Sequence, residues 1–274
     1  MKNTLTFLLI FAFGILFSQT HRFFYELSFK SDSTATDYTK DYYVLDITPD
    51  EQKFYNYEFL QNDSINKANL MDEEKYIFSS PELDIRLIHK KDGTFYNYLE
   101  KAPLYYLQKT NDKQNWTITP DKKKIGKYDV QKATTNFGGR TWEAWFASEL
   151  PLVYGPYKFC GLPGLILEIR DTKENYIFSF TGNKNLKINP DTSDFLETQH
   201  KAKPFEITQK QWEKLQLDYF SNPLKNYESD LFTKNENGEI VKIDSRETIK
   251  AIQNNLHKNN NPIELDKAIK YPDK

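Results

Sequence analysis

Short runs of aromatic and aliphatic residues recur along the first two thirds of the chain, and this recurrence constrains the fold more than any other feature. Turn-forming residues separate the runs, as Asp92-Gly93 does between two of them. Apolar and polar side chains alternate within several runs, which is typical of strands with one face on a core. The pattern predicts a mainly β protein with an antiparallel meander, its strands near 23–29, 42–47, 54–59, 76–78, 85–88, 94–96, 104–107, 116–119, 128–135, 140–146, 165–169 and 176–180.

The C-terminal third has a different pattern. Apolar residues at helical spacing predict two helices, at about 209–220 and 245–257, within a helical part that spans about 205–260. Such apolar stripes are more typical of helices packed on a core than of membrane or partner surfaces, so we expect both helices to pack on the sheet. Residues 254–261 are predicted to form a loop, and 263–274 a loose tail.

The N-terminus has the pattern of a secretory signal peptide. Lys2 is followed by an uncharged, mostly apolar run from Leu5 to Phe17, which is too short to span a membrane. Ser18 suits the last position before cleavage, although an uncleaved anchor is an alternative. We therefore predict a signal peptide at 1–18 and an exported, periplasmic or extracellular protein of one β-rich domain, 19–274. No cysteine lies near the cleavage site, so a lipoprotein is not expected.

Charge and motifs exclude several classes of function. The chain has 37 Lys and Arg against 39 Asp and Glu, so no basic excess points to nucleic acid. No metal-ligand spacing, phosphate-binding loop or catalytic motif is present, so we predict no cofactor, no metal and no enzymatic activity. Cys160 is the single cysteine; it is interpreted as a small buried apolar residue, with a nucleophile or an intermolecular disulfide as alternatives.

Glycine is concentrated in the middle of the chain, where six of the ten glycines fall within 126–164. Gly155-Pro156 and Leu162-Pro163-Gly164 are turn signals, and Pro-Gly suits the centre of a type II turn. This segment is predicted to form a loop that closes one end of the sheet and re-enters it at Leu165.

The hexapeptide Gly161-Leu162-Pro163-Gly164-Leu165-Ile166 resembles the motif that names the GLPGLI family, exported proteins found mainly in Bacteroidetes. Neighbouring segments are also similar to that family: 124–128, 131–135, 139–140, 144–146, 155–159 and 167–171. The resemblance implies a β-rich, extracytoplasmic protein and names no activity. It also suggests a bowl-shaped or half-open barrel sheet, as in periplasmic lipoprotein carriers and the N-terminal module of some bacterial peptide-N-glycanases.

Two interpretations of this segment are open. In the structural one, turn geometry is its whole role, carried by Gly155, Pro156, Gly161, Leu162, Pro163, Gly164, Leu165 and Ile166. In the functional one, the segment is a lid over a cavity. The residues predicted to bind a ligand or partner are Arg140, Trp145, Tyr154, Tyr157, Lys158 and Phe159.

Two classes of function follow. The first is a binding module for an apolar or amphipathic ligand such as a lipid or glycan, which requires a sizeable aromatic-lined cavity. The second is a protein–protein interaction or assembly factor of the envelope, which requires an exposed aromatic patch. A hydrolase is less favoured, because no catalytic constellation is recognised and the sequence gives no separation between the carboxylates of Glu143 and Glu168. Arg140 and Lys158 are expected to form surface ion pairs with Glu143, Glu149 or Glu168.

Overall fold

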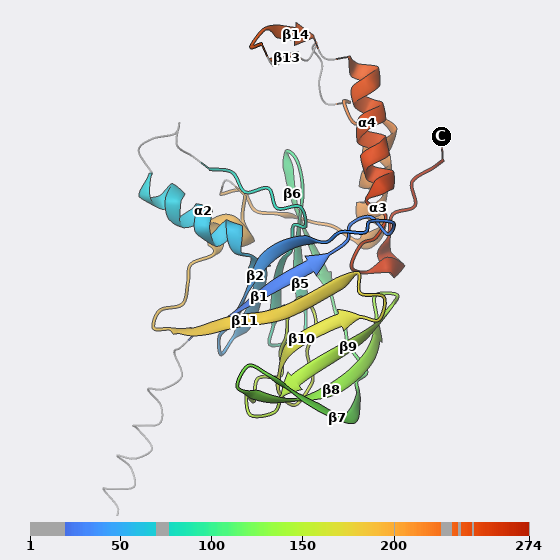
Figure 1. Ribbon diagram of the computed structural model, residues 1–274. Helices are drawn as coiled ribbons and strands as arrows, with labels where there is room; N and C mark the ends of the chain where they lie inside the picture. The colour runs from blue at the N-terminus through green and yellow to red at the C-terminus, as the bar shows by residue number, and fades with distance from the viewer. Residues whose placement is uncertain are drawn as a thin grey trace, which may run out of the picture.

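The computed structural model describes residues 20–69, 77–199, 201–225, 232–234, 237–242 and 244–273; the predicted signal peptide, 1–18, lies outside them. The described chain forms one open, curved sheet of twelve strands with a few helices (Figure 1). In spatial order the strands are β12 (Phe205–Glu206), β6 (Leu104–Thr110), β5 (Phe95–Lys101), β4 (Arg86–Lys90), β3 (Glu51–Asn56), β2 (Thr39–Ile47), β1 (Thr20–Phe29), β11 (Tyr176–Leu186), β10 (Leu165–Asp171), β9 (Arg140–Ala147), β8 (Tyr128–Phe137) and β7 (Thr117–Ile125).

The strand order confirms the predicted mainly β meander. Neighbours in the sheet are neighbours in sequence within two runs, β1 to β6 and β7 to β11, and all of these pairs are antiparallel. The long β1–β11 pairing joins the two runs, and short β12 pairs with β6 in parallel. Because β12 and β7 end the order, the sheet does not close into a barrel. None of the described helices is long and apolar enough to span a membrane.

One predicted strand is replaced in part by a helix. The expected strand at 54–59 ends at Asn56, whose side chain accepts a hydrogen bond from the Glu58 N–H and caps α2 (Tyr57–Ala68). The aromatic run is thus interrupted by an N-cap residue, whose side chain accepts a hydrogen bond from a backbone N–H that has no partner within the helix. The strand expected at 76–78 is also wrong where it is described, because Ile77 and Phe78 form a non-strand segment beside α2.

The two predicted C-terminal helices are present. Thr208 caps α3 (Gln209–Ser221) in a capping box, and Asp244 caps α4 (Ser245–Lys258). The α3 helix lies against the sheet at β6, where the Trp212 and Tyr106 ring centres are 5.9 Å apart. The α4 helix packs on α3, and the hairpin of β13 (Phe232–Lys234) and β14 (Ile240–Lys242) lies at its far end (Figure 1).

The larger core lies on one face of the sheet, here called the inner face, which carries Tyr25, Phe54 and Trp142. The segment 150–164 lies on this face, where Phe159 and Leu162 are buried among the side chains of the strands. A smaller core occupies the opposite, outer face, beneath α2 and the π-helix η2 (Ser193–Glu197). The inner face is therefore filled by the protein's own glycine-rich segment.

The turn within the hexapeptide differs from the prediction. Gly161 has a φ of +92°, whereas Gly164 has no positive φ, so a type II turn centred on Pro163-Gly164 does not form. Gly164 is required for close approach instead. A Cβ there would lie 2.2 Å from the carbonyl oxygen and 2.6 Å from the carbonyl carbon of Ala147 in β9.

A Gly164→Ala substitution tests this close approach. We expect it to lower the free energy of unfolding by at least ~2 kcal/mol, because backbone atoms of a central strand must move. Gly182→Ala is the matched control, since a Cβ there meets nothing within 4 Å and its φ is not left-handed. Urea unfolding should place the control within about 0.5 kcal/mol of the parent chain. Equal losses in both variants would contradict the packing argument.

Candidate functional site

Four of the predicted binding residues lie in or beside the segment on the inner face. Tyr157, Lys158 and Phe159 are buried, and the Phe159 ring centre lies 4.6 Å from that of Trp142. Tyr154 is half-buried, and its ring meets that of His89 edge-on at 6.1 Å. These side chains fill the inner face, and their contacts there are with the protein's own residues.

Arg140, also a predicted binding residue, anchors the C-terminal end of the chain. Its guanidinium donates to the Ile263 carbonyl at 3.0 Å, the Pro262 carbonyl at 2.7 Å and Asn261 Oδ1 at 2.6 Å. It also pairs with Asp171 at 3.1 Å. The loose tail predicted at 263–274 is therefore wrong for its first residues, because a buried guanidinium requires acceptors and this segment supplies them. Residues 261–267 are called the C-terminal strap below.

Lys158, which lies just before the hexapeptide in the sequence, also binds the strap. Its Nζ lies 2.7 Å from Glu264 Oε1 and 2.8 Å from Asp112 Oδ2, and its side chain is 1% exposed. The Tyr157 hydroxyl donates to Glu264, which also pairs with Lys267. The pKa values of Glu264 and Asp112 are lowered: burial pushes both up, but the neighbouring lysine charges outweigh it.

The surface ion pairs expected for Arg140 and Lys158 are thus wrong, and two of the three acids proposed for them have other partners. Glu143 pairs with Lys132 and Glu168 with Lys123, each at 2.8 Å, on the outer face of β8 to β10. Trp145 projects from this face too, with Lys123 Nζ 4.4 Å from its ring centre. The sheet therefore separates Trp145 from the other predicted binding residues.

Cys160 has the environment of a structural residue. Its N–H donates to Gln114 Oε1 at 3.2 Å, and burial raises the pKa of its thiol to about 11. A thiol with such a pKa is almost wholly protonated at neutral pH and is a weak nucleophile. Across the described ranges, no group of three or more His, Cys, Asp or Glu side chains is placed to hold a metal ion.

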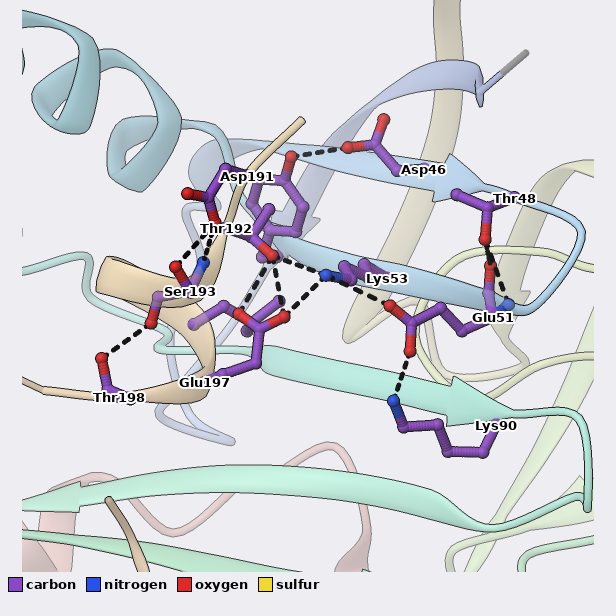
Figure 2. A network of polar contacts seen from close by, with 12 residues as sticks. Asp46, Thr48, Glu51, Lys53, Lys90, Asp191, Thr192, Ser193, Glu197 and Thr198 are labelled. Atoms are coloured by element: carbon purple, nitrogen blue, oxygen red, sulfur yellow. Dashed lines mark hydrogen bonds and ion pairs between the residues drawn. The ribbon is translucent and has the colours of Figure 1, made fainter. Parts of the chain in front are cut away.

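A polar network on the outer face fixes η2 to the sheet (Figure 2). Lys53 Nζ in β3 donates to Glu197 Oε1 at 2.6 Å and to Thr192 Oγ1 at 2.7 Å. Glu51 pairs with Lys53 at 3.2 Å and with Lys90 of the next strand. Deeper in the same face, Asp46 accepts two hydrogen bonds of 2.6 Å from Arg22. The network holds a segment remote in sequence against β3 and β4.

Beside this network lies a cleft of about 160 Å³ between α2, η2 and strands β4 and β5, here called the outer cleft. Two nearly parallel rings, Phe59 and Phe195, with centres 6.5 Å apart, form its aromatic floor. The remaining lining residues are Asn62, Asp63, Asn66, Ile77, Phe78, Ser79, Arg86, Glu100, Asp194, Thr198 and Gln199. The cleft thus combines aromatic rings with side-chain amides, hydroxyls and carboxylates.

Arg86 lies at the base of the outer cleft with its charge compensated. Its Nε donates to Asp84 and its Nη2 to Glu100, both at 2.9 Å. The guanidinium carbon lies 4.1 Å from the ring centre of Phe59 and 5.3 Å from that of Tyr105. Cation–π contacts on two rings and two carboxylates hold this group in place.

One wall of the cleft is held by amides of α2. Asn66 makes two hydrogen bonds of 2.8 Å with the backbone of Ile77, and Asn62 Nδ2 donates to Ser79 Oγ at 2.9 Å. Phe78 stands at the rim with 70% of its surface exposed. The sequence prediction misses this site, because it places residues 54–59 in a strand and assigns no helix to the rest of α2 or to η2. Asn56 before an amide-rich stretch was the one available signal.

Comparison with known proteins gives a family of unknown function and a fold. Residues 137–168 match the model of a Bacteroidetes-associated family described as "Protein of unknown function (Porph_ging)". Two crystal structures of PNGF-II, in space groups C2 and P21, match with TM-scores of 0.53 at 17% and 16% identity. Each match covers 72% of this chain but only 32% and 33% of PNGF-II, so the likeness is one of fold with about a third of that protein. No curated protein matches the chain.

The strap cluster makes stability depend on pH. Because the folded-state pKa values of Glu264 and Asp112 are lowered, their ion pairs contribute fully above the ordinary carboxyl values of 4.5 and 3.8. That contribution is lost as the pH falls through the lower folded-state values. We expect Glu264→Gln to cost about 3–5 kcal/mol at pH 7, since it leaves Lys158 underpaired, and to flatten the acid side of the stability profile.

Urea unfolding at several pH values between about 3 and 7 measures both effects. Glu213→Gln, on the exposed side of α3, is the control and should follow the parent profile. A Glu264→Gln profile as steep as that of the parent would show that the cluster does not carry the acid sensitivity.

Proposed function

We propose that this chain is an exported, non-catalytic binding module of the cell envelope, and that an amphipathic ligand occupies the outer cleft. The observation that carries the proposal is that two aromatic rings and several hydrogen-bonding side chains line the same concave site. The inner face, where a ligand was expected from the sequence, is occupied by residues 150–164. The proposed site is therefore on the opposite face of the same sheet.

Export and family membership belong to the proposal. The pattern at residues 1–18 supports a signal peptide, and the mature chain, 19–274, is proposed to be one periplasmic or extracellular domain that is not a lipoprotein. The hexapeptide at 161–166, which lies inside the segment matched by the family model, supports membership of the GLPGLI family. The partial match to a longer protein is consistent with a fold used as a module.

A second candidate function is protein–protein interaction through the β13–β14 hairpin and α4. Phe232 and Ile240 of the hairpin are 60% and 73% exposed, and they stand on neighbouring strands. The apolar stripe of α4 is only half-buried, and no residue of that helix is fully buried. Since an isolated two-stranded hairpin is marginally stable in water, a partner that covers this surface would stabilise it.

Native mass spectrometry of the mature protein, purified from its own envelope without detergent, tests the binding function. We expect a reproducible extra mass on the parent chain. Ser79→Trp, which places an indole in the outer cleft, should abolish it. Ser80→Trp is the matched control, because Ser80 is exposed and does not line the cleft. A bare mass for the parent chain, or an extra mass that survives in Ser79→Trp, would contradict the proposal.

Site-specific photocrosslinking in the native envelope tests the interaction function. A photoreactive phenylalanine analogue at position 232 should give one discrete adduct with a protein. The same analogue at position 205 is the control, because Phe205 is equally exposed, at 60%, but lies on β12 at the sheet edge. Identical adduct patterns at the two positions, or none at 232, would count against a specific partner for the hairpin.

A further inference from the structure

We propose that the ligand of the outer cleft is an uncharged saccharide, one ring of which lies in the cleft; this inference rests on the proposed binding function. Three properties of the cleft favour such a ligand: the hydrogen-bonding chemistry of its lining, its charge and its size. Together they separate saccharides from the lipids and anionic ligands that an amphipathic envelope site could otherwise take.

The uncharged polar lining suits a partner covered with hydroxyl groups. Asn62, Asn66, Ser79, Thr198 and Gln199 line the cleft. Asn66, Asn62 and Thr198 already bind protein groups, but an amide or hydroxyl oxygen has two lone pairs and can accept a further hydrogen bond. A sugar hydroxyl can donate such a bond and can also accept one. An acyl chain can do neither, and it would remove these groups from water without replacing their partners, which is unfavourable.

The charges of the lining disfavour an anion. Among the described lining residues three are carboxylates, Asp63, Glu100 and Asp194, and one is a cation, Arg86. A second cation, Lys67 of α2, pairs with Asp63 at 2.9 Å, so carboxylates exceed cations by one. Arg86 is already bound by Glu100 and by Asp84. A phosphate headgroup or a uronate would therefore meet like charges, and the two cations described there, Arg86 and Lys67, are already paired with carboxylates. Uncharged hydroxyl-rich ligands avoid this repulsion.

Size and aromatic surface fit one ring. A volume of about 160 Å³ is below the roughly 300–1,000 Å³ typical of sites for drug-sized ligands. The cleft therefore suits a single ring with its substituents, and the rest of the ligand would lie along the rim. Phe78 stands at that rim with 70% of its surface exposed, where its ring can contact the apolar C–H side of a sugar.

Calorimetric titration with matched probes tests the inference. The probes are uncharged trisaccharides of glucose, mannose, galactose and N-acetylglucosamine, a galacturonic acid trimer, and phosphatidylethanolamine–phosphatidylglycerol vesicles. At least one uncharged trisaccharide should bind, and Phe78→Ala should weaken it about fivefold to tenfold through loss of the rim contact. Phe205→Ala, a change of the same residue type at a site that is also exposed, 60% against 70% for Phe78, should alter affinity by less than about twofold.

Glu100→Gln isolates the charge argument, because the amide oxygen can still accept from Arg86. The variant should keep its affinity for the uncharged trisaccharide within about twofold and bind the galacturonic acid trimer more tightly than the parent does. Tighter binding of uronate or vesicles than of every uncharged sugar, blocked by Ser79→Trp, would overturn the saccharide assignment and keep the cleft as the binding site. Absence of binding by all probes overturns the saccharide assignment, and together with a bare native mass it also overturns the binding function.

Discussion

A sheet that curves without closing leaves the apolar side chains of its inner face open to solvent unless another segment covers them. The rest of this structure depends on the segment that does so. Residues 150–164 are that segment, and Gly164 allows their exit into β10 because its backbone lies against Ala147. This filling of the inner face brings Lys158 into the interior, where Arg140 of β9 is also buried. Two buried cations require acceptors, so Asp112, Asp171 and the C-terminal strap are drawn onto the same region.

The filled inner face decides on which side of the sheet the proposed ligand could bind. A half-open β-sheet suggests a bowl, but this bowl contains its own chain, and aromatic side chains that could have lined a cavity are core residues. The outer face of β3 to β5 is different, because two short helical segments, α2 and η2, stand on it and leave a cleft between them. The polar network around Lys53 keeps η2 in place, so the cleft has a rigid wall (Figure 2).

The fold was largely predictable, and the site was not. Aromatic runs predict strands well because the alternation of apolar and polar residues is visible within each run. The capping residues Thr208 and Asp244 likewise predict the starts of α3 and α4. The cleft depends on α2, where one asparagine cap overrides an aromatic run that continues in strand-like fashion. It also depends on contacts between residues more than a hundred positions apart, such as Lys53 with Glu197, which no local pattern contains.

The hexapeptide and the cleft are independent in sequence, and this bears on what the motif means. The segment matched by the family model, 137–168, contains strand β9, the inner-face filling and two buried cations, and none of the cleft residues. Its glycines act through backbone conformation and close approach, which determine fold and not ligand. The cleft is built from α2, the segment after it, β4, β5 and η2. In this structure the motif therefore acts on the scaffold, and the ligand proposed above would take its contacts from those other segments.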